Sequence, residues 1–192
     1  MVDFVSEFKK YCVDRNWKFD NYTSEFTFQF RICRFLDSMN MANEIELESN
    51  IQRYNFPQLI KKEIDIDFID LKGKKIAMEL KFVRDLGSFN IGMYKFCEDV
   101  KFLEQLVQNG FDSGFALIFT TIEKIYTRSN KEMKPRNPEN TALYCSFREK
   151  FQISGSLSIK TGNLNQSILL KGKYDLNWED FLGNIKVCVV KV

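Results

Sequence analysis

Hydrophobic and polar residues alternate along residues 62–83, in two segments separated by a glycine-containing turn. In an extended strand, residues two apart point to the same face of a sheet. One face then carries Glu63, Asp65, Asp67, Lys75, Glu79 and Lys81, together with Ile69, Ala77 and Val83. The opposite face carries Ile64, Ile66, Phe68, Ile76, Met78, Leu80 and Phe82. The pattern predicts a β-hairpin whose apolar face packs on a core.

The turn of this hairpin sets the register of its strands. Directly opposed residues of an antiparallel pair share a face, so odd-numbered acids on both strands require a loop with an odd number of residues. Leu71-Lys72-Gly73 fits, because loops of three residues favour glycine last, in the left-handed conformation. This register sets Asp65 opposite Glu79, with Asp67 one step along the diagonal, so three carboxylates are expected in one patch.

A helix and a buried strand follow the hairpin. Residues 90–108 have apolar residues at helical spacing, and Asn109-Gly110 supplies a stop signal. Residues 115–119 form an unbroken apolar run, which is typical of a strand in a parallel position covered on both faces. Strand, helix and strand make a right-handed crossover. The chain is therefore predicted to be α/β, with a mixed central sheet flanked by helices.

The two ends of the chain extend this core. Residues 2–17 suggest an amphipathic helix, which either packs on the sheet or serves dimerisation. Residues 24–39 fit a helix capped by Ser24, although Phe26, Phe28, Phe30 and Ile32 also alternate as in a strand. Residues 151–174 predict a hairpin and residues 187–192 a last strand. We expect one domain over residues 1–192, with a core at about 24–121 and a β-rich elaboration at 122–192.

The expected carboxylate patch is suited to a hard cation. Neighbouring carboxylates resist ionising together unless a cation neutralises them. Magnesium prefers a few carboxylate oxygens, keeps several waters and completes its shell with substrate phosphate. Zinc is disfavoured because the chain has no histidine and its five cysteines form no CxxC pair. The scattered cysteines are typical of free thiols in a reducing cytoplasm, and the lack of histidine excludes Ser-His-Asp and Cys-His catalysis.

The hairpin and the elements after it resemble the PD-(D/E)xK nuclease superfamily, which includes many type II restriction endonucleases. The likeness lies in residues 66–69, Gly73, the Glu79-Leu80-Lys81 triplet, the following helix and the next buried strand. It implies a restriction-endonuclease-like fold. No proline precedes either aspartate.

The resemblance also implies roles for individual residues. Asp67 would be the first metal ligand and Glu79 the second, with Asp65 as a close alternative to Asp67. Lys81 would lie near the attacking water. Glu25 corresponds to the acidic residue that many members place on the helix before the sheet, although a surface Glu25 on a core helix fits the residues equally well.

The resemblance thus implies a magnesium-dependent endonuclease that cleaves double-stranded DNA, with Mn²⁺ able to replace Mg²⁺. A homodimeric type II restriction enzyme is the leading interpretation, since cutting both strands of a palindrome requires two related sites. A repair or junction-cleaving nuclease and a non-catalytic nucleic-acid-binding protein are the alternatives. Taken alone, Glu79-Leu80-Lys81 would also fit solvated charges on an exposed strand face.

Contacts to DNA are expected at local basic positions, because the net charge of +2 does not itself indicate nucleic-acid binding. The predicted positions are Lys62, Lys74, Arg128, Lys134 and Arg136. The segment around the last three contains Pro135 and Pro138, so a surface loop without a ligand is an equal alternative. The apolar stretches are too short to span a bilayer and no apolar leader is evident, so we expect no membrane association and a cytoplasmic location.

Overall fold

The computed structural model describes residues 4–19, 23–57, 59–128, 135 and 137–192. Its helices are α1 (Phe4–Asp14), α2 (Glu25–Ser38), α3 (Phe89–Gln108), α4 (Glu123–Tyr126) and α5 (Thr141–Cys145), with short helical turns η1 (Ile51–Tyr54), η2 (Pro138–Asn140) and η3 (Ser146–Lys150). Its strands are β1 (Ala42–Asn50), β2 (Glu63–Asp70), β3 (Lys75–Val83), β4 (Ser113–Thr120), β5 (Gln152–Thr161), β6 (Leu164–Asp175), β7 (Trp178–Asp180) and β8 (Lys186–Lys191).

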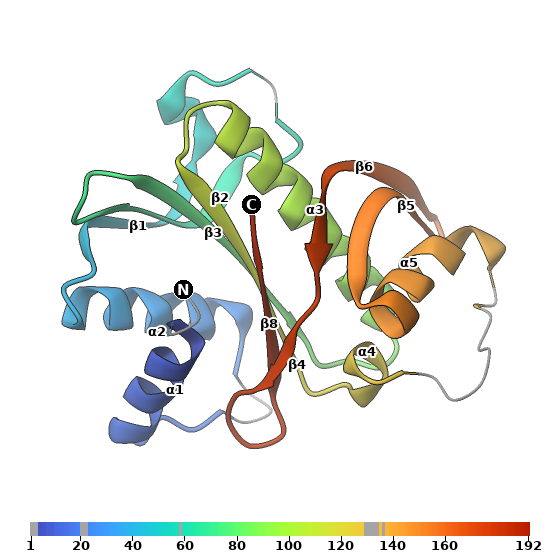
Figure 1. Cartoon of the computed structure of the whole chain (residues 1–192), viewed down its shortest axis with the longest axis horizontal. Coiled ribbons are helices and arrows are strands. Elements are labelled where there is room, and N and C mark those ends of the chain that lie inside the picture. The colour runs from blue at the N-terminus through green and yellow to red at the C-terminus, as the bar shows by residue number, and fades with distance from the viewer. Residues whose placement is uncertain (1–3, 20–22, 58, 129–134, 136) are drawn as a thin grey trace.

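A mixed sheet organises the described part of the chain (Figure 1). It has six strands in the order β1-β2-β3-β4-β8-β7. β3 and β4 run parallel, whereas the other neighbouring pairs are antiparallel. β5 and β6 form a separate hairpin. The predicted α/β class, with a mixed sheet, flanking helices and additional C-terminal β structure, is confirmed.

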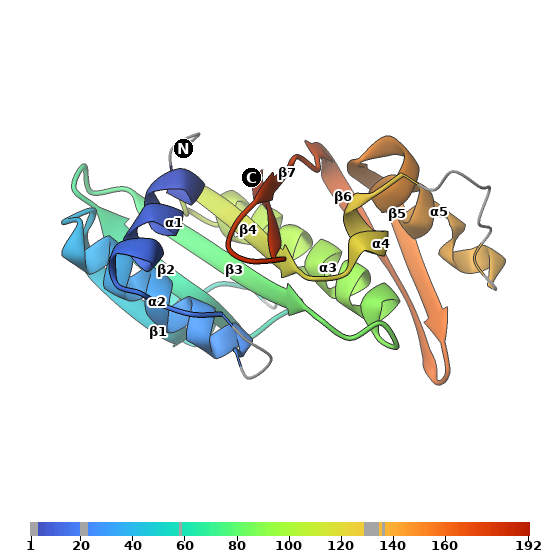
Figure 2. The same cartoon turned by 90° about the horizontal axis from the view of Figure 1, so that it is seen from below.

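The sheet is covered on both faces. α1 and α2 lie on one side of it and α3 lies on the other, as both views show (Figures 1 and 2). The side chains of α1 and α2 pack with even-numbered residues of β2 and β3, namely Ile66, Phe68, Met78 and Leu80. The side chains of α3 pack with Ala77 and Val83 of β3 and with the β5–β6 hairpin. The face that holds the predicted acids is therefore the face beneath α3.

The register of the β2–β3 hairpin is the predicted one. Phe68 pairs with Ile76 and Ile66 pairs with Met78, and the Asp70 amide donates a hydrogen bond to the Lys74 carbonyl oxygen at 2.9 Å. The loop thus consists of Leu71, Lys72 and Gly73, and Gly73 has a φ of 77°, in the left-handed region. An odd loop ending in glycine is confirmed.

The prediction that Ile64 shares the apolar face of Ile66 is wrong. Ile64 belongs to the core on the α3 side, while Ile66 belongs to the core on the α1–α2 side. The last paired residues of β2 and β3 are Ile66 and Met78, so Ile64 lies beyond the ladder that holds the alternation in place. The two strands diverge at this point.

α3 and β4 confirm the predicted order of strand, helix and parallel strand. α3 covers the predicted residues 90–108, and β4 pairs in parallel with β3 from Ile76–Ser113 to Val83–Thr120. Helix and strand come very close where Gly92 of α3 meets Val83 of β3. A Cβ atom at Gly92 would lie 2.6 Å from Val83 Cγ2, so glycine permits this approach.

Residues 25–38 form a helix rather than the alternative strand. Ser24 caps α2, since its hydroxyl oxygen accepts a hydrogen bond from the Thr27 amide at 3.2 Å. The helix separates two phenylalanines that a strand would place on one face. Phe28 is 0% exposed and stacks on Phe119 with ring centroids 4.1 Å apart, whereas Phe26 is 57% exposed.

The C-terminal segment completes the central sheet as well as extending it. The predicted hairpin is present as β5 and β6, and the predicted last strand is present as β8, which pairs with β4. Buried Glu104 of α3 anchors the hairpin, because its Oε1 accepts hydrogen bonds from the Lys171 and Gly172 amides at 2.7 Å each. In the described residues, no helix is both long and apolar enough to cross a membrane.

The packing of α2 gives a direct test of the fold. We expect Phe28→Ala to lower the free energy of unfolding by about 3–5 kcal/mol, because it leaves a cavity against Phe119. Phe26→Ala is the matched control and should change it by less than about 0.5 kcal/mol. Chemical denaturation measures both values. Equal losses would show that these residues share a face, as in the rejected strand.

Candidate active site

Four acidic and two basic side chains meet beneath α3, and we call them the carboxylate–lysine cluster. They come from the start of α2, the segment before β2, β2 itself, β3 and α3. Its members are Glu25, Lys61, Asp65, Glu79, Lys81 and Asp99. The divergence of β2 from β3 opens the space in which they meet.

Glu79 is the most deeply buried member, with 0% of its surface exposed. Its Oε1 accepts a hydrogen bond from the Asp65 amide at 3.2 Å, and its Oε2 accepts one from the Lys61 ammonium group. Asp65 Oδ2 in turn accepts a hydrogen bond from the Leu80 amide at 2.7 Å. Side chains thus bridge the strands where the backbone ladder has ended. Glu79 is therefore not a solvated charge on an exposed strand face.

Lys81 lies beside Asp65 and Glu79, and it forms an ion pair with Glu25 of α2. Its Nζ atom lies 2.8 Å from Glu25 Oε1 and 4.0 Å from Asp99 Oδ2. Glu25 Oε2 also accepts a hydrogen bond from the Phe82 amide at 2.9 Å. Both oxygens of the Glu25 carboxylate are therefore held, one by the Lys81 ammonium group and one by the backbone of β3.

Asp99 was not assigned to the site from sequence. It is 3% exposed, and its Oδ1 lies 3.0 Å from Lys61 Nζ. Its Oδ2 is buried and has no hydrogen-bond partner among the described residues. A signal existed, because Asp99 lies three residues after Phe96 and four before Leu103, on the apolar stripe of the predicted helix. A charged residue on such a stripe requires partners in the interior.

Burial raises the pKa of the two most buried acids of the cluster, Glu79 and Asp99. Burial is the main cause for Glu79, whose pKa is well above its usual value; the negative charge of Asp65 adds to this and the positive charge of Lys61 opposes it. Burial also raises the pKa of Asp99 to about 6, although Lys61 and Lys81 act to lower it.

The lysines of the cluster hold their protons strongly. Burial acts to lower the pKa of each, but neighbouring carboxylates outweigh it, mainly Glu79 and Asp99 for Lys61, and Asp99 and Glu25 for Lys81. Both pKa values are therefore raised. Both ammonium groups are charged at neutral pH and hold the cluster together by electrostatic attraction.

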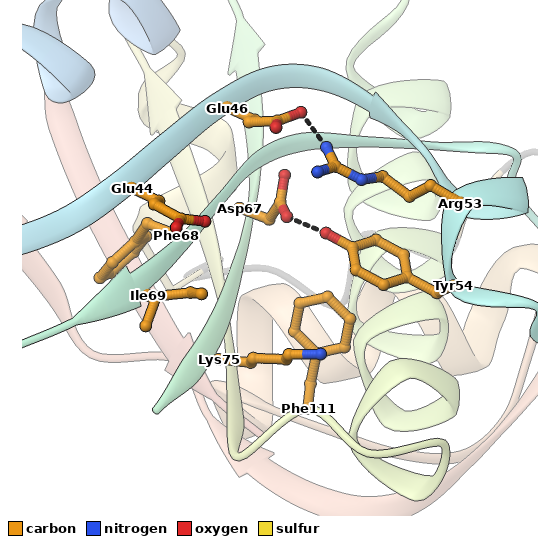
Figure 3. A pocket seen from close by; sticks show the side chains of 9 residues that line it. All are labelled: Glu44, Glu46, Arg53, Tyr54, Asp67, Phe68, Ile69, Lys75 and Phe111. Carbon is orange, nitrogen blue, oxygen red and sulfur yellow. Dashed lines mark hydrogen bonds and ion pairs between the residues drawn. The ribbon is translucent and has the colours of Figure 1, made fainter. Parts of the chain in front are cut away.

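Asp67 lines an adjacent pocket, and its side chain bonds to Tyr54 rather than to a member of the cluster. It pairs with Ala77 of β3 and Glu46 of β1, and its Oδ2 accepts a hydrogen bond from the Tyr54 hydroxyl (Figure 3). Its Oδ1 is buried without a hydrogen-bond partner in the described part of the chain. The pocket has a volume of about 190 Å³ and is lined by Glu44, Glu46, Arg53, Tyr54, Asp67, Phe68, Ile69, Lys75 and Phe111.

The predicted DNA contacts do not gather in one place. Lys62 is exposed beside the cluster, whereas exposed Lys74 lies at the hairpin tip, roughly 20 Å along β3 from Lys81. Arg128 is exposed, with its guanidinium carbon 5.7 Å from the centre of the Phe151 ring. Lys134 and Arg136 lie outside the described residues.

The residue types of the cluster fit a hard divalent cation. Its acids supply only oxygen donors and outnumber its lysines, and the buried Asp99 Oδ2 lacks a hydrogen-bond partner among the described residues. The arrangement is closed, however. In the described ranges no three side chains of the metal-ligating types converge as a ligand set. The Lys61 ammonium group lies between Glu79 and Asp99 and pairs with both.

Three comparisons with known proteins add nothing to this geometry. No family model matches the chain, no curated protein is significantly similar to it, and no solved structure resembles it significantly. Inferences about function must therefore rest on the chain's own residues.

The raised pKa of Asp99 predicts how stability changes with pH in metal-free buffer. The folded protein holds the Asp99 proton to about pH 6, whereas an unfolded chain releases it near pH 4. Asp99 therefore lowers the free energy of unfolding as pH rises through this window. We expect Asp99→Asn to become progressively more stable relative to the wild type from about pH 4 to 6.

Urea unfolding of both proteins at a series of pH values measures this difference. Asp180→Asn is a control of opposite sign, because a hydrogen bond from Lys186 lowers the pKa of Asp180. That variant should lose stability relative to the wild type as pH rises through the acidic range. If the free energy of unfolding of Asp99→Asn differed from that of the wild type by the same amount at every pH, the raised pKa of Asp99 would be contradicted.

Proposed function

We propose that this chain is a magnesium-dependent nuclease of the PD-(D/E)xK type that hydrolyses phosphodiester bonds in DNA. The observation that supports this most strongly is the buried Glu79 carboxylate, which lies against Asp65 on one side with Lys81 two residues further along the same strand. The hairpin is followed by a helix and a parallel strand, as the resemblance requires.

Asp65 and Glu79 are the metal ligands in this proposal, with Asp65 taking the place first considered for Asp67. The Asp65 amide bonds to Glu79 and the Asp65 carboxylate bonds to the backbone of β3, so these two acids are neighbours. The bond from Tyr54 directs Asp67 into the adjacent pocket. Mg²⁺ is the proposed ion and Mn²⁺ a substitute, since both prefer oxygen ligands.

The chemistry of the proposal divides between metal and protein. A divalent ion held by these carboxylates would act as a Lewis acid, which would lower the pKa of a bound water and stabilise negative charge on the phosphate. Lys81 orients the attacking water and adds positive charge beside the scissile phosphate. Glu25 acts through Lys81, because its bond to Nζ holds the ammonium group in place. Glu25 is thus a positioning residue.

Double-stranded DNA is the proposed substrate, and a homodimeric type II restriction enzyme the proposed setting. Exposed Lys62 beside the cluster and exposed Arg128 are the proposed phosphate contacts. A cytoplasmic location fits the five cysteines, all of which are free in the described structure. Repair or junction cleavage would use the same residues, and discrete fragments from a linear duplex would favour restriction.

The closed arrangement of the cluster favours one alternative. Lys61 already neutralises Glu79 and Asp99, and a buried ion-pair network of this kind also fits a nucleic-acid-binding protein that does not cleave. Incubation with plasmid separates the two functions. The proposed nuclease cuts in Mg²⁺ and stops when chelator is added, whereas a binding protein retains DNA without cutting it.

Removal of a proposed ligand or of the lysine should abolish cleavage. We expect Glu79→Gln and Lys81→Met each to slow magnesium-dependent plasmid cleavage by about 100-fold or more, while the affinity for DNA changes little. Lys95→Met and Glu98→Gln are matched controls on α3, since these two residues pair with each other outside the cluster. Gel analysis of plasmid and a DNA-binding assay measure the two effects.

The same assay distinguishes the two aspartates. Asp65→Asn should reduce cleavage as strongly as Glu79→Gln, and Asp67→Asn should reduce it much less. Full activity in Glu79→Gln and Lys81→Met would eliminate the proposed mechanism. The reverse order of the two aspartates would return Asp67 to the metal site.

A further inference from the structure

Lys61 occupies the position between the two most buried acids of the cluster. Its ammonium group bonds to Glu79 Oε2 and lies 3.0 Å from Asp99 Oδ1. The two carboxylates are 0% and 3% exposed. A buried pair of acids is costly without a nearby cation, so Lys61 neutralises them in the absence of metal.

The backbone of Lys61 belongs to neither a helix nor a strand. It lies in the segment between η1 and β2, where the neighbouring Ile60 amide donates to the Gln105 side chain at 3.1 Å. The Lys61 side chain is 30% exposed. Its ammonium group is a point charge on a flexible stem. The Lys61 side chain is thus partly open to solvent, and its backbone lies outside the ladder of β2.

A divalent cation would use the same oxygen atoms as this ammonium group. Two cations cannot share Glu79 Oε2 and Asp99 Oδ1 without strong mutual repulsion. The second oxygen of Asp99 is buried and has no hydrogen-bond partner among the described residues, so Asp99 has a free acceptor directed into the cluster, 4.0 Å from Lys81 Nζ. Occupancy by Lys61 and occupancy by a metal therefore exclude each other.

We propose that Lys61 is a displaceable internal cation: a divalent metal ion binds Glu79 and Asp99 only by expelling the Lys61 ammonium group into solvent. This inference rests on the proposed metal-dependent function and adds Asp99 to its ligands. Lys61 weakens metal binding and stabilises the metal-free fold. The cluster is then closed without metal and opens when metal enters.

Lys61→Met tests this exchange, because it keeps most of the unbranched stem and removes the charge. Calcium is the probe, since binding of a hard cation to oxygen ligands can be measured without cleavage. By isothermal titration calorimetry, we expect Lys61→Met to bind Ca²⁺ at least about tenfold more tightly than the wild type. In chelator its Tm should fall, and Ca²⁺ should restore it. Lys95→Met removes a lysine from α3 outside the cluster and should match the wild type.

The wild-type protein provides a second measurement that does not depend on the folding of the variant. Brief acetylation of lysines followed by mass spectrometry reports which amines are accessible. Adding Ca²⁺ should increase modification of Lys61 and leave that of Lys95 unchanged. Unchanged or reduced modification of Lys61 by a protein that binds Ca²⁺ would overturn the displacement.

Two combinations of Ca²⁺ binding and cleavage distinguish a failure of the proposed role of Lys61 from a failure of the proposed function. Equal Ca²⁺ affinity of wild type and Lys61→Met, together with magnesium-dependent cleavage by the wild type, would overturn the role of Lys61 alone. Absence of Ca²⁺ binding to both proteins would overturn the metal site, and with it both proposals.

Discussion

Glu79 carries its carboxyl group into the interior beneath α3, and burying a charged group is costly unless other groups compensate it. The compensation comes from the Lys61 ammonium group and the Asp65 amide. These partners meet Glu79 beyond Ile66 and Met78, where the backbone pairing of β2 with β3 has ended. The arrangement of the site thus depends on where one backbone ladder ends.

The remaining members of the cluster follow from that position. α3 brings Asp99 to Lys61, and the start of α2 brings Glu25 to Lys81. Each lysine is therefore held by carboxylates from different elements. The two helices lie on opposite sides of the sheet, so the cluster joins both layers at one end of the hairpin (Figure 2). A change in the packing of either helix would alter the electrostatics of the site.

The local features of the fold could be predicted from sequence. The parity of the acids and the position of Gly73 specify the hairpin register, and the apolar runs specify α3 and β4. These signals depend on residues close together in the chain. β1 (Ala42–Asn50) was not predicted. Most of its residues are polar and its apolar side chains Ile45 and Leu47 are only half-buried, as expected for a strand at the edge of a sheet.

The composition of the site was less predictable because it depends on contacts between distant segments. The alternation of a strand places Asp65 and Asp67 on the same face and cannot distinguish them. They are distinguished only by the end of the backbone ladder and by the hydrogen bond from Tyr54. Lys61 and Asp99 are 38 residues apart, so their pairing follows from the docking of α3. The sequence also left open whether Glu25 begins a helix or a strand. The burial of Phe28 and the exposure of Phe26 show that it begins a helix.

Crystals soaked in Mn²⁺ and measured at a wavelength with strong manganese anomalous scattering provide the most direct test of the central claim. The account predicts an anomalous peak within coordination distance of Asp65 and Glu79, with the Lys61 ammonium group moved away from Glu79. A peak beside Asp67 in the adjacent pocket, with none at Glu79 and Lys61 still paired, would contradict it.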